Sequence, residues 1–329
     1  SLHDARPICR IIREMSQPQV PLPTEQSGKL HFLEDIQAVF FDIYGTLFIS
    51  CSGDIGVVSI EPVQEELDDS PQDQLTLVLG KKFFELFPDC LLMSSSSSVG
   101  RHAKLECDME DDWRKCGHQL IASFRDKVQQ IHQVKQEQGI PWPEVDVRQI
   151  WREIIGDSDA IGSEKVSQID RWAIEYETQT NPVWPMPNAT DCIDRLGSAN
   201  LTLGIISNAQ FYTPLLFPAL LNKQLEDLEI AAEMQYYSYR EGRAKPDPWM
   251  FQQAARALAH KGITARQTLY VGNDMRNDIL PASQIGFRTA LFAADRRSLR
   301  LRENDPHIAQ TVPDIIVTNL QEVVECVLK

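Results

Sequence analysis

Residues 38–48 read AVFFDIYGTLF, and this stretch decides the fold class of the chain. Its first four residues are all apolar, whereas a strand with one face in water would alternate apolar and polar residues. An apolar run of this kind is typical of a strand buried on both faces inside a parallel sheet. The run ends at Asp42, and Gly45 indicates a turn just after it. We therefore expect a central strand with a carboxylate at its C-terminal end.

Beyond Pro187 the sequence alternates between short apolar runs and segments with apolar residues every three or four positions. The expected strands are residues 202–206, 268–271, 289–292 and 314–317, and the expected helices are residues 189–196, 249–260, 277–285 and 320–328. Strands separated by such helices indicate right-handed βαβ units, which build an α/β fold with a doubly wound, Rossmann-like parallel sheet. Ligands bind such sheets at the carboxyl ends of the strands, where Asp42, Ser207 and Asp274 are expected.

The segment before Pro187 has a helical pattern. Helices are expected at residues 75–86, 120–134, 147–155 and 166–176, the second and fourth being the longest. Between the first two, residues 93–112 contain five consecutive serines and an acidic run at 106–112, so we expect a loop there. The predicted organisation is an N-terminal arm at residues 1–30, a core formed by residues 31–50 and 187–329, and a helical cap domain at residues 51–186.

The composition excludes several classes of partner. The 329 residues carry 32 Lys and Arg against 47 Asp and Glu, and the net charge of −15 disfavours binding to nucleic acid or to an anionic membrane surface. No apolar run approaches the 18 residues of a membrane span. The seven cysteines are scattered without a C-x-x-C pair, as is typical of a reducing compartment. We therefore expect a cytoplasmic protein with a small-molecule ligand and with no nucleic-acid or membrane partner, and nothing in the sequence indicates an oligomeric state.

Four short polar segments follow the expected strands or turns in a fixed order. They are residues 41–47 (FDIYGTL), 206–209 (ISNA), 244–247 (AKPD) and 271–278 (VGNDMRND). Together they closely resemble the four motifs of the haloacid dehalogenase superfamily of hydrolases. The resemblance covers about residues 31–50 and 187–329, and it implies that the helical segment between these two parts is the superfamily's cap.

The residue types in these segments suit group transfer. Asp42 is a carboxylate at a strand end and is able to act as a covalent nucleophile. Lys245 supplies a positive charge for the charge that builds up in a transition state, and the hydroxyls of Thr46 and Ser207 are donors. Gly45 allows close approach of the backbone to a substrate. The expected catalytic residues are Asp42, Tyr44, Thr46, Ser207 and Lys245, and the expected substrate-binding residues are Gly45, Ser207, Asn208 and Lys245.

Three of the carboxylates also suit a metal ion. Asp42, Asp274 and Asp278 would form the cluster of hard oxygen ligands that Mg²⁺ prefers. The resemblance implies that Asp42 and Asp274 bind the ion directly, that the backbone carbonyl of Tyr44 contributes a third oxygen, and that Asp278 supports them from nearby. Asn273 leaves two registers open, and the spacing of four residues from Asp274 to Asp278 favours Asp274. We therefore predict a Mg²⁺ cofactor at these residues.

Tyr44 departs from the pattern of the superfamily's phosphatases, which usually carry there a second Asp that protonates the leaving alkoxide. General-acid assistance contributes about 10²–10⁴ in rate, and a tyrosine with a pKa of about 10 supplies a proton only inefficiently. Three interpretations stay open: a phosphatase whose leaving group is good, such as an acyl phosphate, or whose acid comes from elsewhere; a 2-haloacid dehalogenase, whose first motif has the form Asp-x-Tyr-Gly-Thr; or a weakly active binding module.

The fourth segment favours the first interpretation. Dehalogenation needs no metal, whereas Asp274 and Asp278 would repel Asp42 and raise its pKa unless a cation lay among them. We therefore predict a Mg²⁺-dependent hydrolase, a phosphatase of a small phosphorylated metabolite that acts through an aspartyl-phosphate on Asp42. A metal-independent 2-haloacid dehalogenase and a catalytically weak binding module are the alternatives.

Overall fold

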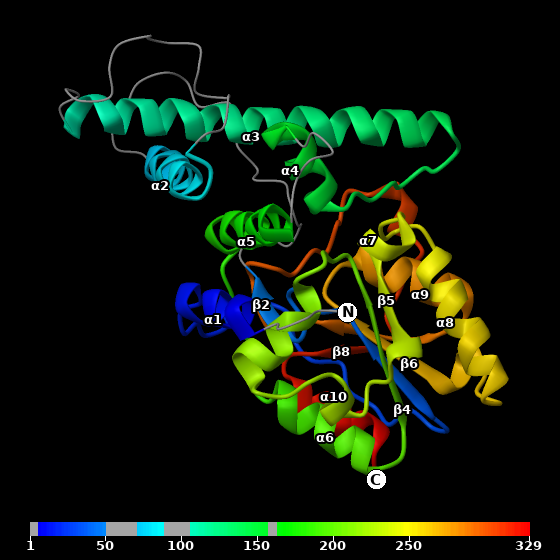
Figure 1. Ribbon diagram of the computed structural model, residues 1–329. Helices are drawn as coiled ribbons and strands as arrows, with labels where there is room; N and C mark the ends of the chain where they lie inside the picture. Colours follow the sequence, from blue (N-terminus) through cyan, green and yellow to red (C-terminus); the bar gives the residue numbers. More distant parts are fainter. Residues whose placement is uncertain (1–5, 51–70, 89–105, 157–162) are drawn as a thin grey trace.

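The computed structural model describes residues 6–50, 71–88, 106–156 and 163–329 (Figure 1). A six-stranded sheet forms its centre, in the order β5-β4-β1-β6-β7-β8, and every strand pair in it is parallel. The strands are β1 (Ala38–Phe41), β4 (Thr202–Ser207), β5 (Gln235–Tyr237), β6 (Thr268–Gly272), β7 (Arg288–Phe292) and β8 (Ile315–Val317). The predicted α/β class with a Rossmann-like parallel sheet is confirmed.

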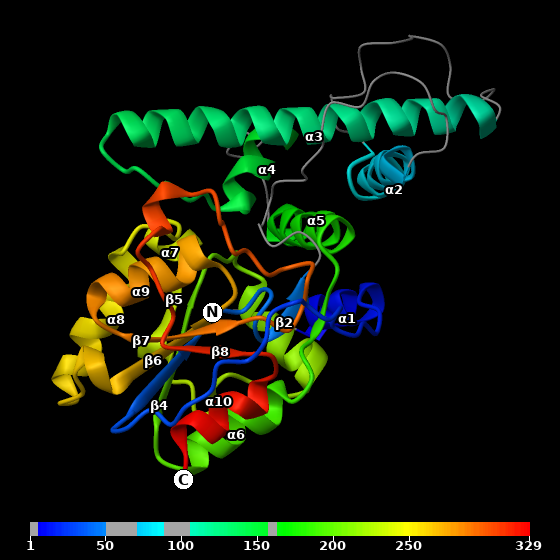
Figure 2. The same ribbon diagram turned by 180° about the vertical axis from the view of Figure 1, so that it is seen from behind.

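Helices cover both faces of this sheet (Figure 2). The apolar run at residues 38–41 is β1. It lies between β4 and β6, and all four of its residues are fully buried. Val39 and Phe41 belong to one apolar cluster and Ala38 and Phe40 to another, because alternate residues of a strand point to opposite faces. The helices are α6 (Ala189–Ser198) and α10 (Leu320–Val327) on the first face, and α8 (Trp249–His260) and α9 (Leu280–Ile285) on the second.

Two parts of the core differ from the predicted elements. The edge strand β5 was not predicted, because three residues among short helical turns are too few to show a period. These turns are η2 (Thr213–Leu215), η3 (Phe217–Leu221), η4 (Glu226–Leu228) and η5 (Ala232–Met234), with α7 (Ser238–Glu241) after the strand. The single helix predicted at residues 277–285 is instead a π-helical turn, η7 (Met275–Ile279), followed by α9. The side chain of Asp274 starts η7 early by accepting hydrogen bonds from its first amides.

The helices between β1 and β4 stand on a two-stranded antiparallel ribbon. β2 (Phe48–Ser50) pairs with β3 (Val183–Pro185), so the chain leaves the core just after Asp42 and returns beside the same point. The helices are α2 (Pro71–Leu86), α3 (Glu106–Glu137), α4 (Val147–Ile155) and α5 (Ser163–Thr180). In Figures 1 and 2 they lie together above one end of the core, on the side of the ribbon.

The helix α3 corrects one prediction. It begins at Glu106, so the acidic run at residues 106–112 is helical and does not lie in a loop. The reason is that Trp113 and Cys116 continue toward the N-terminus the apolar spacing that begins at Leu120. The rest of the expected loop, residues 93–105, lies outside the described residues. The two longest described helices are α3, with 32 residues, and α5, with 18, as predicted. No described helix has the length and apolar character that a membrane span requires.

Two glycines let α2 and α3 pack closely together. A Cβ atom on Gly80 would lie 1.8 Å from the carbonyl oxygen of Trp113, and one on Gly117 would lie 2.0 Å from that of Thr76. Both distances are far below a van der Waals contact, so each helix presses its backbone against the other at a glycine.

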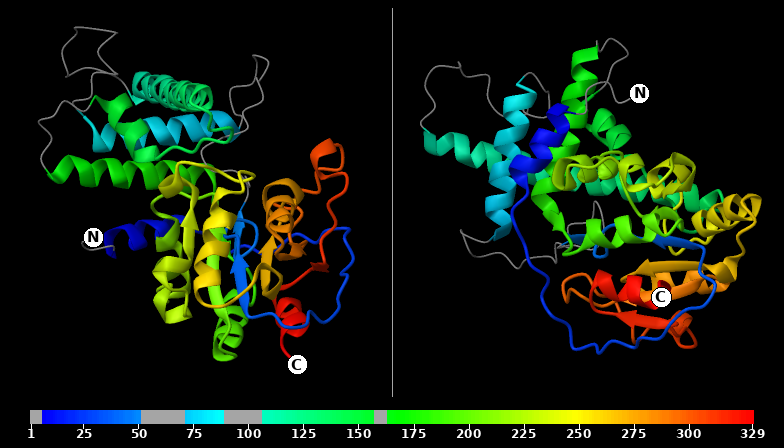
Figure 3. Two further views of the ribbon diagram at one scale, coloured as in Figure 1. Left: turned by 90° about the vertical axis from the view of Figure 1, so that its right-hand side faces the viewer. Right: turned by 90° about the horizontal axis from the view of Figure 1, so that it is seen from below.

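The N-terminal segment contacts both the helical insertion and the core. α1 (Arg6–Met15) packs against α5 and η3, and Arg13 Nε donates to the carbonyl of Ala219 at 2.9 Å. The chain then runs along the C-terminal part of the sheet, as Figure 3 shows, before it enters β1. On the way Thr24 Oγ1 donates to the carbonyl of Ala293 at 2.7 Å, and Lys29 pairs with Ile316.

We expect Gly80→Ala to destabilise the protein by about 1–3 kcal/mol, because the added methyl must push the two helices apart. At an exposed position in a helix, Gly→Ala would raise the free energy of unfolding by up to about 1 kcal/mol. A decrease at Gly80 would therefore indicate close packing of the two helices. Urea unfolding of both proteins, followed by circular dichroism, measures the difference. Gly28→Ala is the matched control: its nearest neighbour would be 3.6 Å away, and we expect a change within about 0.5 kcal/mol. Equal stability of wild type and Gly80→Ala would contradict the close packing.

Candidate active site

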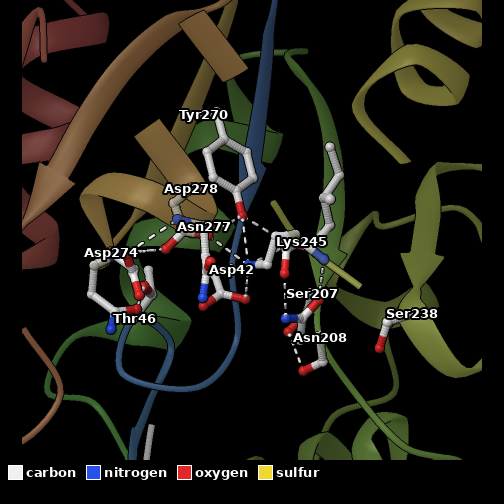
Figure 4. Close-up of polar contacts among 12 residues, drawn as sticks. Asp42, Thr46, Ser207, Asn208, Ser238, Lys245, Tyr270, Asp274, Asn277 and Asp278 are labelled. Carbon is white, nitrogen blue, oxygen red and sulfur yellow. Dashed lines mark hydrogen bonds and ion pairs between the residues drawn. The ribbon is translucent and has the colours of Figure 1, made fainter. Parts of the chain in front are cut away.

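The candidate site lies at the carboxyl ends of β1, β4 and β6. The register places Phe41 opposite Ile205 and Val271, so the residues that follow these strands meet at one edge of the sheet. Figure 4 shows the side chains that converge there. The pocket between them is lined by Asp42, Tyr44, Asn208, Lys245, Asn273, Asp274, Asn277, Arg300 and Arg302.

Lys245 is the centre of the arrangement. Its ammonium group lies 2.8 Å from Asp42 Oδ1, 2.5 Å from Asp278 Oδ1 and 3.1 Å from the hydroxyl of Tyr270. Burial by itself lowers the pKa of this lysine, but the charges of Asp278 and Asp42 outweigh burial and raise the pKa above its usual value. The side chain is 3% exposed, so a buried positive charge holds the candidate nucleophile in place.

Asp278 connects Lys245 to the backbone of the fourth motif. Its Oδ1 contacts Lys245 and Tyr270, and its Oδ2 accepts hydrogen bonds from the amides of Asn273 at 3.0 Å and Asp274 at 2.9 Å. Burial raises the pKa of this carboxyl to about 6, although Lys245 acts in the opposite direction. Both oxygens are engaged, so the geometry fits the supporting role that the resemblance implied better than direct metal binding. Gly272 is required beside it, because a Cβ there would lie 2.5 Å from Asp278 Cγ.

Asp274 lines the pocket and is 6% exposed. Its Oδ1 accepts hydrogen bonds from the amides of Arg276 at 2.8 Å and Asn277 at 3.1 Å, which fixes the carboxylate at the start of η7. Its Oδ2 forms an ion pair with Arg302 Nη2 at 2.7 Å. The sequence argument expected a metal ion at this carboxylate and did not foresee the arginine.

The loop of the first motif is fixed against the fourth. Gly45 has a φ of +83°, and a Cβ on it would lie 2.6 Å from both Asn273 Nδ2 and Ser298 Cβ. Thr46 Oγ1 donates to Asn273 Oδ1 at 3.1 Å, and Asn273 Nδ2 donates to the carbonyl of Ser298 at 2.7 Å. We expected Gly45 to allow close approach of the backbone to a substrate and Thr46 to offer a donor. Neither is among the residues that line the pocket, and both join the loop of the first motif to that of the fourth.

The second motif positions Lys245. Asn208 Oδ1 accepts a hydrogen bond from the amide of Lys245 at 2.7 Å, and its Nδ2 donates to the carbonyl of the same residue at 3.3 Å. Asn208 therefore holds the lysine backbone as well as lining the pocket. Ser207 is not among the lining residues, and its hydroxyl donates to the carbonyl of Asn208 at 3.2 Å.

Tyr44 is a poor proton donor in this setting. Its hydroxyl lies 2.9 Å from Thr213 Oγ1, and the side chain is 5% exposed. Burial raises the pKa of the phenol far above its usual value, and the charges of Glu177 and Asp42 raise it further. The tyrosine therefore stays protonated and holds its proton more tightly than a free phenol.

The donor set fits a magnesium ion that shares its ligands with water and substrate. Among the described residues, no group of three or more His, Cys, Asp or Glu side chains is arranged to hold a metal by itself. Mg²⁺ in proteins commonly uses one or two carboxylates together with waters and phosphate oxygens. Asp42 and Asp274 lie on the wall of one pocket, with the side chain of Asn277 beside them, and offer such a partial set.

Sequence reasoning missed several residues of the site, among them Tyr270, Arg300 and Arg302. Tyr270 reads as one more apolar residue of β6, although its hydroxyl lies 2.9 Å from the carbonyl of Ile206 and 3.0 Å from Asp278 Oδ1. The two arginines did leave a signal. Residues 296–302 read RRSLRLR, a basic cluster shortly after a strand in a chain of net charge −15.

Comparisons with known proteins agree with the motifs. A family model described as haloacid dehalogenase-like hydrolase matches residues 36–286. The rhythmically expressed gene 2 protein of Drosophila melanogaster is 28% identical over 160 residues, which cover 45% of this chain and 58% of that protein. The phospholysine phosphohistidine inorganic pyrophosphate phosphatase of Mus musculus is 34% identical over 85 residues, which cover 26% of this chain and 29% of that protein. The matched part is thus less than two thirds of the length of either relative.

A comparison with solved structures gives a further match. A HAD phosphatase from Thermococcus onnurineus is 14% identical, with a TM-score of 0.46, over 88% of this chain and 97% of the other.

We expect Tyr270→Phe to lower the free energy of unfolding by about 1–3 kcal/mol, because it removes a buried hydroxyl that links Lys245, Asp278 and the carbonyl of Ile206. Chemical unfolding measures the loss. Tyr236→Phe is the matched control, since its hydroxyl donates to the carbonyl of Glu233 at 3.0 Å at the edge of the sheet, and we expect a loss below about 1 kcal/mol. An equal loss in both variants would contradict the special role of Tyr270.

Proposed function

Because this chain belongs to the haloacid dehalogenase-like hydrolases, we propose that it is a Mg²⁺-dependent phosphatase of a small phosphorylated molecule that acts through Asp42. The observation that carries the proposal is the pair of buried carboxylates, Asp42 and Asp274, on one pocket wall with the ammonium group of Lys245 2.8 Å from the first. This arrangement combines a fixed nucleophile, a fixed positive charge and a partial set of metal ligands.

In the first step a carboxylate oxygen of Asp42 attacks phosphorus as the bond to the leaving oxygen breaks, which forms an aspartyl-phosphate. Lys245 orients the carboxylate and donates to the phosphoryl oxygens as negative charge shifts among them. In the second step water attacks the aspartyl-phosphate, releases inorganic phosphate and restores the Asp42 carboxylate. Mg²⁺ held by Asp42, Asp274 and the backbone carbonyl of Tyr44 would neutralise the charge of the transferred group.

Phosphoryl transfer is favoured over dehalogenation by Asp274. A halide leaves without a metal ion to assist it, whereas phosphoryl transfer uses a divalent cation, for which Asp274 offers a second carboxylate ligand beside Asp42. The mouse relative is named as a phosphatase, which supports the same choice. The helices α2 to α5 are proposed as a cap that closes over the site and excludes water, because their ribbon begins directly after the first motif.

The leaving group is proposed to be weakly basic. Among the described residues that line the pocket, the carboxyl and phenol groups are Asp42, which is the nucleophile, Asp274, which is paired with Arg302, and Tyr44, whose pKa is raised; the pKa of Lys245 is raised as well. None of these is suited to protonate an alkoxide. An acyl phosphate needs no proton because its carboxylate leaves as a stable anion, so this class fits the pocket better than an alkyl phosphate.

The location is proposed to be cytoplasmic. Cys9, Cys192 and Cys326 are free thiols buried in the described part of the chain, as is usual in a reducing compartment.

We expect the purified protein to release phosphate from acetyl phosphate in Mg²⁺, and EDTA or Asp42→Asn to abolish this activity by about 10³-fold or more. Asp194→Asn, an exposed site on α6 that pairs with Lys223, is the matched control and leaves the rate unchanged. The assay is phosphate release with malachite green, run beside chloride release from 2-chloropropionate. Chloride release that persists in EDTA would replace the phosphatase proposal by dehalogenation, and a folded protein without either activity would favour a binding module.

Tyr44→Asp introduces the acid that related phosphatases carry. We expect it to raise the rate on glycerol phosphate relative to acetyl phosphate by about tenfold or more, because only the alkoxide needs a proton. Tyr44→Phe is the control and keeps the ratio of the wild type. If wild type hydrolyses both substrates equally and Tyr44→Phe loses only the alkyl phosphate, Tyr44 is itself the acid and the proposed substrate class is wrong.

A further inference from the structure

Arg302 forms an ion pair with Asp274, one of the two candidate metal ligands. Its Nη2 lies 2.7 Å from Asp274 Oδ2, and its Nε lies 3.3 Å from the same oxygen and 3.4 Å from Oδ1. The guanidinium therefore reaches across the carboxylate, whose Oδ1 also accepts the two amides at the start of η7. The side chain of Asp274 is 9% exposed and that of Arg302 is 33% exposed, so water screens this ion pair mainly from the side of the arginine.

The loop that carries Arg302 is joined to the fourth motif through the backbone. The amide of Met275 donates to the carbonyl of Arg300 at 2.9 Å, and the amide of Arg300 donates to the carbonyl of Asn273 at 3.0 Å. Arg302 itself has a φ of +55°, a left-handed conformation that is uncommon for a residue other than glycine. Such conformations persist where the surroundings fix them, and they gather at functional sites.

The N-terminal segment braces the other end of the same loop. Arg297 Nη2 donates to the carbonyl of Val20 at 2.8 Å, and the amide of Arg296 donates to the carbonyl of Leu22 at 2.8 Å. Arg297 also forms an ion pair at 2.7 Å with Asp295, which is fully buried. The loop is therefore anchored on both sides, and the position of Arg302 at the pocket is determined by the fold.

We propose that Arg302 sets the divalent-cation affinity of this site by competing for Asp274. The inference rests on the proposed function, because it takes Asp42 and Asp274 as the cation ligands. A guanidinium and a divalent cation that approach the same carboxylate repel each other, so a cation binds Asp274 only at the cost of the ion pair. The chain thus carries its own competitor for the cation, on a loop that the N-terminal segment holds in place.

Titration of the apo protein with MgCl₂ by isothermal calorimetry tests this directly, without use of activity. We expect Arg302→Gln to bind Mg²⁺ about three- to tenfold more tightly than wild type. Arg300→Gln is the matched control: Arg300 lines the same pocket with the same charge, but its Nη1 donates to the carbonyls of Arg297 at 2.7 Å and Leu299 at 3.1 Å in its own loop. We expect less than about a twofold change for it, since it alters the general field and not the pairing.

A double substitution separates competition from any other effect of the arginine. In the Asp274→Asn background Mg²⁺ affinity falls, and the further change Arg302→Gln no longer raises it. Arg302→Lys keeps the charge and loses the two-point contact, so we expect a Mg²⁺ affinity between those of wild type and Arg302→Gln. This variant replaces Arg302→Gln in the titration if circular dichroism shows that Arg302→Gln does not fold.

The outcomes distinguish this inference from the proposed function. Equal Mg²⁺ affinity of wild type and Arg302→Gln, with Mg²⁺-dependent phosphate release intact, would overturn only the role of Arg302. Equal gains in Arg302→Gln and Arg300→Gln would also overturn it, because the effect would then be general charge. No Mg²⁺ binding in any variant, together with activity that survives EDTA, would overturn the metal-dependent function and this inference with it.

Discussion

One ammonium group shared between two buried carboxylates is the constraint on which the rest of the site depends. Lys245 lies 2.8 Å from Asp42 and 2.5 Å from Asp278, with the hydroxyl of Tyr270 beside it. Removing a charged group from water is costly unless a partner compensates, so none of these three charges would be tolerated in the interior alone. The positions after β1 and β6 and the loop that carries Lys245 must therefore stay in register for the protein to remain folded, and the same register fixes the nucleophile.

Glycines and one threonine allow these loops to approach each other closely. Gly45 and Gly272 leave space that a methyl group would fill, against Asn273 in the first case and Asp278 in the second. Thr46 then hydrogen-bonds to Asn273, so the first and fourth motifs form one unit. Gly45 and Thr46, which the sequence predicts to be site residues, thus also fix the loops that carry Asp42 and Asp274.

The balance of charge explains how an acidic chain could accept an anionic substrate. With a net charge of −15, the global field opposes a phosphate ester. The pocket wall nevertheless carries Lys245, Arg300 and Arg302 against Asp42 and Asp274. The local excess of positive groups, and in the proposed function a divalent cation, replaces the attraction that the surface lacks. Because the arginines come from the loop after β7, the C-terminal half of the sheet contributes to the site as well as the motif strands.

The sequence by itself determined the α/β class, five of the six strands of the central sheet, and the positions of Asp42, Ser207 and Asp274 at strand ends, because periodicity and short motifs are local properties. Only the tertiary structure decided that Asp278 accepts hydrogen bonds from the backbone of the fourth motif, that the hydroxyl of Tyr270 makes hydrogen bonds inside the core, and that Arg302 pairs with Asp274. It also decided that α3 begins at Glu106. These features depend on groups that are distant in the chain or buried together, and the free energy of burying a charge depends on the partner that folding places beside it.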